Sequence, residues 1–154
     1  MNEKPRRSRI QASERAKIDR NVLLWLSSWP DLPPDIVRGR VLPEASLPAD
    51  VSGMALSRIT TAYKNEPSYI TGGYSAEYQF SVIYRIKPTS ADDSLNADEL
   101  LNNLGDWAEL NKPDLGDGIR VIKATPTSQA EFLFPYENGD EDHQIPMKII
   151  YEVI

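Results

Sequence analysis

The stretch Tyr74–Lys87 reads YSAEYQFSVIYRIK, and its alternation of apolar and polar side chains predicts the clearest strand of the fold. One set of alternate positions is Tyr78, Phe80, Val82, Tyr84 and Ile86, and the other is Gln79, Ser81, Ile83, Arg85 and Lys87. Because successive side chains of a strand point to opposite faces, the first set forms an aromatic and aliphatic face. We expect that face to pack on helices and the largely polar face to meet water or another subunit.

Two helices are expected to cover the apolar face. Apolar side chains recur at helical spacing from Ile18 to Trp29 and predict a helix from about residue 10 or 13 to Ser28. The prolines after Trp29 end it. For the second helix, Asn96 is the predicted cap and Glu99 completes a capping box. Its apolar stripe is Leu100, Leu101, Leu104, Trp107, Ala108 and Leu110.

Gly105 lies inside the second helix, where glycine costs about 1 kcal/mol relative to alanine. Close packing against a neighbouring element is the favoured explanation. Further strands are predicted at Asp35–Val41, Gly53–Tyr63, Ile119–Ala124, Thr127–Phe134 and Ile145–Ile154. The dipeptide Asn138-Gly139 predicts a turn, and the apolar C-terminal end is expected to be tied into the sheet.

The order of these elements predicts one α+β domain over residues 10–154, with a mainly antiparallel sheet and two principal helices on one face. Residues 1–9 are expected to form a flexible basic arm. Residues 1–20 hold seven bases and three acids, whereas the whole chain carries a net charge of −6. The arm bases Lys4, Arg6, Arg7 and Arg9 could contact nucleic acid or an acidic neighbouring subunit. The alternative is a solvated start to the first helix.

Composition limits the chemistry that the chain can perform. The 154 residues contain no cysteine, which excludes disulfides, thiolate catalysis and thiolate zinc sites. No apolar run approaches the roughly 20 residues of a membrane span, and no hydrophobic signal region follows the basic start. We therefore expect the protein to stay in the compartment where it is made, with no membrane partner.

No motif points to a catalytic, metal or cofactor site. Gly72-Gly73 and Gly116-Asp117-Gly118 precede strands, so they are interpreted as turn glycines and not as a phosphate cradle. The acidic loop Glu137–Asp142 lacks the alternating pattern of a calcium loop. It is interpreted as a solvated hairpin tip, with a docking loop for a basic partner as an alternative. His143, the single histidine, has no evident nucleophile or orienting partner in the sequence.

A working surface is predicted instead of a pocket. It combines the polar strand face, a loop around Gly72-Gly73 and the acidic loop. The candidate subunit or partner interface residues are Tyr69, Thr71, Tyr74, Gln79, Ser81, Arg85, Glu137, Asp140, Glu141 and Asp142.

Several segments resemble a known family. They are Gly53–Leu56, Tyr69–Tyr74, Tyr78–Arg85, Ala97–Leu101, Leu104–Ala108, Tyr136–His143 and Tyr151–Ile154. Residues 20–154 resemble small phage minor capsid proteins of prophages in Gram-positive, clostridium-like bacteria, some of which are labelled chloramphenicol resistance proteins. Acetyl transfer would need a histidine motif with a nearby Asp-Gly, which His143-Gln144-Ile145-Pro146 does not supply.

That family is similar to tail-terminator and tail-completion proteins, which have a small α/β fold and form a ring, usually of six subunits. The resemblance implies a ring at the head-proximal end of a phage or phage-like tail. It implies as partners further copies of the chain, the tail tube protein, and a sheath or collar/connector protein, with possible transient contact with DNA in the lumen. It implies no cofactor. Two alternatives remain open: a head–tail connector or adaptor, and an enzyme such as an acetyltransferase or a metal-dependent hydrolase.

Overall fold

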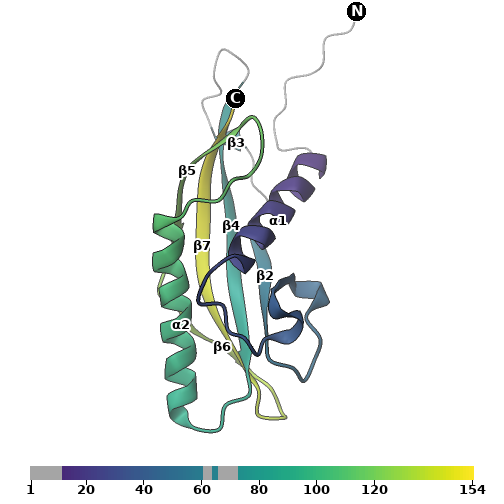
Figure 1. Ribbon diagram of the computed structural model, residues 1–154, viewed down its shortest axis with the longest axis vertical. Coiled ribbons are helices and arrows are strands. Elements are labelled where there is room, and N and C mark those ends of the chain that lie inside the picture. The colour runs from purple at the N-terminus through teal and green to yellow at the C-terminus, as the bar shows by residue number, and fades with distance from the viewer. Residues whose placement is uncertain (1–11, 61–63, 66–72) are drawn as a thin grey trace, which may run out of the picture.

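The computed structural model describes residues 12–60, 64–65 and 73–154 of the chain. In chain order its elements are α1 (Ala12–Ser27), η1 (Val37–Gly39), β1 (Val41–Pro43), η2 (Glu44–Ser46), β2 (Gly53–Thr60), β3 (Lys64–Asn65), β4 (Tyr74–Ile86), α2 (Ala91–Leu110), β5 (Ile119–Pro126), β6 (Glu131–Pro135) and β7 (Glu141–Val153). Here η denotes a short 3-10 helix. Both α-helices lie on one face of the sheet (Figure 1).

The described strands form one sheet in the order β1-β2-β4-β7-β5, with β3 beside β4 and β6 beside β7. Among these described strands, only the pairing of β1 with β2 is parallel, and the other pairs are antiparallel. The predicted fold class, α+β with a mainly antiparallel sheet and two principal helices on one face, is therefore confirmed.

The pairing of β4 with β7 forms the centre of the sheet. Its register runs without a shift from Tyr74 opposite Val153 to Ile86 opposite Glu141. The strand predicted for Tyr74–Lys87 is confirmed. The C-terminal strand is longer than predicted, because it begins at Glu141, and it is tied into the sheet as expected. Beyond β7, the Ile154 N–H donates to the Gly118 carbonyl at 2.9 Å.

The core lies between this sheet and the helices. Phe80 and Val82 of β4 are 0% exposed, as are Val22 of α1 and Leu101 of α2. The two helices also touch each other. The rings of Trp25 and Trp107 stack with centroids 5.5 Å apart, and Trp25 Nε1 donates to the Asn111 carbonyl. The helical stripes predicted from apolar spacing therefore build one shared layer, although Leu110 is 85% exposed and does not belong to it.

A second, smaller apolar cluster occupies the opposite face of the sheet. Leu42, Ala55 and Ile83 are aligned across β1, β2 and β4, and all three are buried. A Cβ placed on Gly53 would lie 2.5 Å from Leu47 Cδ1, so the β1–β2 connection folds over this face. The expectation of a face open to water or another subunit is wrong at this end, because the chain covers it.

Two local predictions are also wrong. Asp35–Val41 is not a strand: it contains the η1 turn, in which Arg38 adopts a left-handed φ of 60°, and the strand begins only at Val41. The second helix begins at Ala91 and not at Asn96. Both the N–H and the Oγ1 of Thr89 donate to Asp93 Oδ2, and these hydrogen bonds lower the pKa of Asp93. The N-cap residue is therefore Ser90 and not Asn96, and the Thr89–Asp93 hydrogen bonds bracket it.

Close packing explains Gly105, as predicted. A Cβ on this residue would lie 2.5 Å from Pro126 Cγ and 3.0 Å from Ile145 Cδ1. We expect Gly105→Ala to lower the free energy of unfolding by about 1–3 kcal/mol, because overpacking outweighs a gain of about 1 kcal/mol in helix propensity. Asn103→Ala, at an exposed position of α2, is the control and should be neutral or slightly stabilising. Urea unfolding of both variants checks this, and equal stabilities would contradict it.

Two core tyrosines differ in how their hydroxyl groups are satisfied. Tyr78 donates to Asp19 Oδ1 at 2.5 Å, whereas the buried Tyr151 hydroxyl has no hydrogen-bond partner among the described residues. We expect Tyr151→Phe to raise the free energy of unfolding by about 1 kcal/mol and Tyr78→Phe to lower it by a similar amount. Urea unfolding at neutral pH measures both effects. A Tyr151→Phe variant less stable than the parent would contradict the prediction.

The same tyrosines predict a loss of stability at high pH. Burial is the main cause that raises the pKa of Tyr78 and of Tyr151 above the ordinary value. Below the unfolded-state pKa of about 10, ionisation of these tyrosines costs no stability. Above it, the unfolded chain ionises more readily than the folded one, so the free energy of unfolding falls as the pH rises. The advantage of Tyr151→Phe over the parent chain should therefore widen between pH 9 and pH 11, at roughly 1.4 kcal/mol per pH unit or less.

Candidate functional site

The predicted interface residues occupy different environments. Tyr69 and Thr71, like Lys4, Arg6, Arg7 and Arg9 of the arm, lie outside the described residues. Tyr74 is 3% exposed and belongs to the core, and Ser81 is 4% exposed. Neither side chain has surface to offer a partner, because each is covered within the subunit. Gln79 is half-buried and donates to Glu77 Oε2 at 3.1 Å.

Arg85 and Asp142 form an ion pair across β4 and β7, on the face opposite the helices. Arg85 Nε donates to Asp142 Oδ1 at 2.8 Å and Arg85 Nη2 donates to Oδ2 at 3.1 Å. The two side chains are 12% and 5% exposed. Hydrogen bonding to Asp142 raises the pKa of Arg85, although burial acts in the opposite direction. This is a bidentate, largely buried pair, which fixes both side chains.

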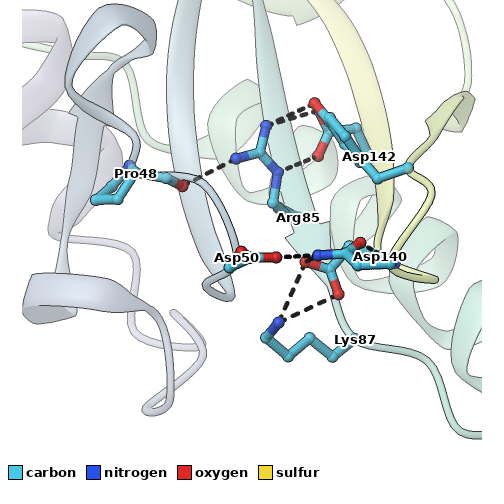
Figure 2. Close-up of polar contacts among 8 residues, drawn as sticks. Pro48, Asp50, Arg85, Lys87, Asp140 and Asp142 are labelled. Atoms are coloured by element: carbon cyan, nitrogen blue, oxygen red, sulfur yellow. Dashed lines mark hydrogen bonds and ion pairs between the residues drawn. The ribbon is translucent and has the colours of Figure 1, made fainter.

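Two further groups surround the same guanidinium. Arg85 Nη1 donates to the Pro48 carbonyl at 3.0 Å, which ties the β1–β2 connection to β4 (Figure 2). Arg85 Nη2 also donates to the Tyr136 hydroxyl, which in turn donates to Asp142 Oδ2 at 2.6 Å. The guanidinium carbon lies 4.7 Å from the centroid of the Tyr136 ring. Arg85 therefore joins three separate segments of the chain.

A second ion pair holds the turn between β6 and β7. Lys87 Nζ contacts both carboxylate oxygens of Asp140, at 3.3 and 3.2 Å (Figure 2). Asn138 donates to Asp50 and to Asp140, and the Asp140 N–H donates to Asn138 Oδ1. Gly139 adopts a φ of 93°, so the predicted Asn138-Gly139 turn is confirmed. The turn is anchored to β4 and to the β1–β2 connection.

The acidic loop is therefore largely neutralised inside the subunit. Asp140 and Asp142 are each 4% exposed and have Lys87 and Arg85 as counter-ions. Their interpretation as exposed docking residues is wrong, because the sequence could not show that bases 53 and 57 residues away would reach them. Glu137 is the member of the predicted set that remains exposed.

His143 has partners that the sequence did not reveal. Its Nδ1 lies 2.7 Å from Asp98 Oδ1 on α2, and its Nε2 lies 2.9 Å from Glu141 Oε2. Ser94 donates to Glu141 Oε2 at 2.7 Å, and the edge of the Phe132 ring meets the imidazole with centroids 5.6 Å apart. Both ring contacts are hydrogen bonds when the imidazole carries two protons. The expectation that His143 lacks an orienting partner is wrong.

The surroundings of His143 limit the reactions in which its ring could take part. The His143 ring is 1% exposed and both nitrogens contact carboxylates, so among the described residues no ring nitrogen faces a substrate. The arrangement joins the first half of α2 to β7. A general base needs to reach the proton that it abstracts, and this geometry leaves no such path.

Two surface hollows lie near these groups. One, of about 340 Å³, is lined by Arg85, Tyr136, Asp140 and the residues around them. The other, of about 510 Å³, lies between the segment after α1 and the start of α2, and its lining includes Asp31, Asp35 and Lys87. The described residues contain no group of three or more His, Cys, Asp or Glu side chains placed to hold a metal ion.

One edge of the sheet carries three consecutive exposed apolar residues, Phe132, Leu133 and Phe134, which we define as the β6 edge. The three residues are 49%, 41% and 53% exposed, in that order. Among the described strands, β6 pairs only with β7, so its other side is an open sheet edge. A register shift at Leu133 places Phe132 on the helix face and Phe134 against Tyr136 on the opposite face. Apolar groups thus surround this edge on both sides.

The opposite edge of the sheet is protected. β1 has three residues, and its Pro43 has no N–H to donate. The Val41 N–H donates to Ser27 Oγ at 3.1 Å. Short length, proline and occupied backbone groups are the usual ways in which proteins block an edge strand. The contrast makes the β6 edge the leading candidate for a binding surface.

Sequence reasoning missed this surface. It predicted a strand at Thr127–Phe134, and the structure has one at Glu131–Pro135. The available signal was the uninterrupted run Phe132-Leu133-Phe134, which lacks the alternation expected of a strand with one buried face.

Comparison of the chain with protein-family models and with curated proteins finds no match. Among the described residues, no helix combines the length and apolar character that a membrane crossing requires.

The buried ion pair predicts an asymmetric response to mutation. Arg85→Met leaves Asp142 buried without its counter-ion, and we expect it to lower the free energy of unfolding by about 3–5 kcal/mol. Lys148→Met is the matched control, because Lys148 pairs with Glu77 across the same two strands at 4.0 Å and both side chains are about one third exposed. It should cost less than about 1 kcal/mol. Urea unfolding compares the two, and equal small losses would contradict the prediction.

Proposed function

We propose that this chain is a structural subunit that forms a ring at the head-proximal end of a phage or phage-like tail. In this role it terminates the tail tube and joins it to the sheath, the collar or the head. Two separate arguments support the proposal, one for assembly and one for its place in the particle.

The β6 edge carries the argument for assembly. An open strand edge with three exposed apolar residues invites pairing with another chain, and proteins that remain alone usually protect such an edge. This subunit protects its β1 edge and not its β6 edge. The difference favours a protein whose β6 edge is covered by a protein partner.

The place in the particle is supported by the resemblance of residues 20–154 to phage minor capsid and tail-terminator-like proteins. The α+β architecture with two helices on one sheet face agrees with the small fold that the resemblance implies. A head–tail connector or adaptor would use the same kind of edge, so the experiment has to separate the two positions.

Deletion of the gene from the genome that encodes the particle tests the proposal. A terminator stops tube growth, so its loss should give tubes of uncontrolled length, visible by negative-stain electron microscopy. Complementation with the parent chain should restore a uniform length and add a ring at one tube end. Complementation with Phe132→Ser/Phe134→Ser should fail, whereas Ile154→Ser, which removes an even more exposed apolar side chain (84%), should succeed.

Tubes of normal length without the gene would overturn the terminator role. If such particles instead lack heads, and the chain co-purifies with portal protein and not with tube, the connector position replaces it. Full complementation by the double Phe variant would remove the β6 edge from the argument.

A further inference from the structure

The charges of the chain are separated along the sequence. Residues 1–90 contain thirteen bases and nine acids, whereas residues 91–154 contain four bases and fourteen acids. Helix α2 alone holds six acids and no base. This separation along the sequence becomes a separation in space only where the fold keeps the unpaired bases of residues 1–90 away from the unpaired acids of residues 91–154.

The outward face of α2 is acidic. Asp92, Glu99 and Asp106 are exposed and follow one another at intervals of seven residues, which places them in one row about 10.5 Å apart. Leu95 lies between them and is 67% exposed. Among the described residues, these three carboxylates have no hydrogen-bond or ion-pair partner, in contrast to Asp140 and Asp142.

The β6 edge belongs to the same side of the molecule. Helix α2 covers the part of the sheet formed by β5 and β7, and β6 extends that side beside β7 (Figure 1). The Ala130 N–H, directly before β6, donates to Asn102 Oδ1 of α2 at 2.8 Å. We call this the acidic side and define it as Asp92, Leu95, Glu99, Asp106 and the β6 edge.

The other side of the molecule carries bases. Arg20 and Leu24 are exposed one helical turn apart on α1, and Leu24 is 68% exposed. Arg38 and Arg40 are exposed directly before β1, at the opposite end of the sheet order from β6. None of these three arginines has an ion-pair partner among the described residues. We call Arg20, Leu24, Arg38 and Arg40 the basic side.

Among the described residues, acids near the basic side are few or face elsewhere. Asp19 contacts Arg58 at 3.3 Å, and Asp31 and Asp35 line the hollow towards the start of α2. Glu44 of η2 is exposed close to β1. Figure 1 shows α1 and α2 over different parts of the sheet, so the two sides lie far enough apart to meet different neighbours.

We propose that copies of this chain dock head to tail, with the acidic side of one copy against the basic side of the next. Exposed leucines on both helices and the β6 edge supply apolar contact, while the carboxylates and guanidinium groups select the partner side. Such a heterologous interface closes into a ring when the rotation between copies allows it. That the copies close into a ring rests on the proposed function. The docking of the acidic side on the basic side does not.

The charges disfavour the symmetric alternative. Two β6 edges paired around a two-fold axis would bring two acidic sides together and place Glu99 and Asp106 near their own copies. Like charges across an interface oppose association, so complementary sides are the better match. A two-fold dimer remains a distinguishable outcome of the experiment.

A charge-swap experiment with the full chain tests the docking. Variant A is Glu99→Lys/Asp106→Lys and variant B is Arg38→Glu/Arg40→Glu, all at exposed positions. Asp117→Lys/Glu137→Lys is the control, because it adds the same charge as variant A in loops outside both sides. Self-association is measured by analytical ultracentrifugation and by negative-stain imaging, in solution and with isolated tail tubes, and circular dichroism checks folding.

Variants A and B should each self-associate at least about tenfold more weakly than the parent, because each now opposes like charges. An equal mixture of A and B should recover assemblies with the two variants alternating, since every junction is again between opposite charges. The control should associate like the parent, and added salt should weaken the parent. Variants A and B that associate like the parent, a mixture that does not recover, or a parent chain that is monomeric under all conditions would overturn the proposal.

The outcomes separate this interface from the tail role. If the charge swaps behave as expected but gene deletion leaves tubes of normal length, the docking stands and the terminator role falls. If rings form at tube ends with variant A as with the parent, the tail role stands and this interface is wrong. Association of variant A alone into two-fold dimers would identify the symmetric β6 pairing instead.

Discussion

The antiparallel pairing of β4 and β7 is the interaction on which the rest of the structure depends. Both strands are thirteen residues long and their register is continuous, so every side chain on either strand has a fixed face and a fixed neighbour. A slip of one residue would exchange the core set, which includes Phe80 and Met147, with the polar set. Both helices pack on the face that this register defines, and the Arg85–Asp142 pair locks the other.

The acidic residues of the second half of the chain serve two different purposes. Three of them, Asp140, Glu141 and Asp142, have fixed partners in Lys87, His143 and Arg85. Those on the outward face of α2 have none among the described residues. In the first group, loss of one partner is costly where the remaining charge is buried, as at Asp142. The second group leaves an unbalanced charge at the surface, which is where a protein partner can use it.

The sequence predicted what depends on local periodicity. The strand at β4, the apolar faces of both helices, the Asn138-Gly139 turn and the close packing at Gly105 follow from spacing and residue type. It failed where a local pattern had competing solutions. Asn96 and Glu99 fit a capping box, but the helix begins after Ser90, where Thr89 donates hydrogen bonds to Asp93. The short, β-branched stretch Asp35–Val41 suggested a strand, but the left-handed Arg38 bends the chain there.

By itself, the sequence determined the fold class, the absence of thiol chemistry and the surplus of acids after residue 90, because these are set by composition and by periods of two and 3.6 residues. Only the tertiary structure decided which of those acids are buried counter-ions and which face outward. It also decided that β1 is protected and β6 is open. These outcomes depend on contacts between residues far apart in the chain, such as Arg85 and Asp142, which are 57 positions apart, and no local pattern encodes such a contact.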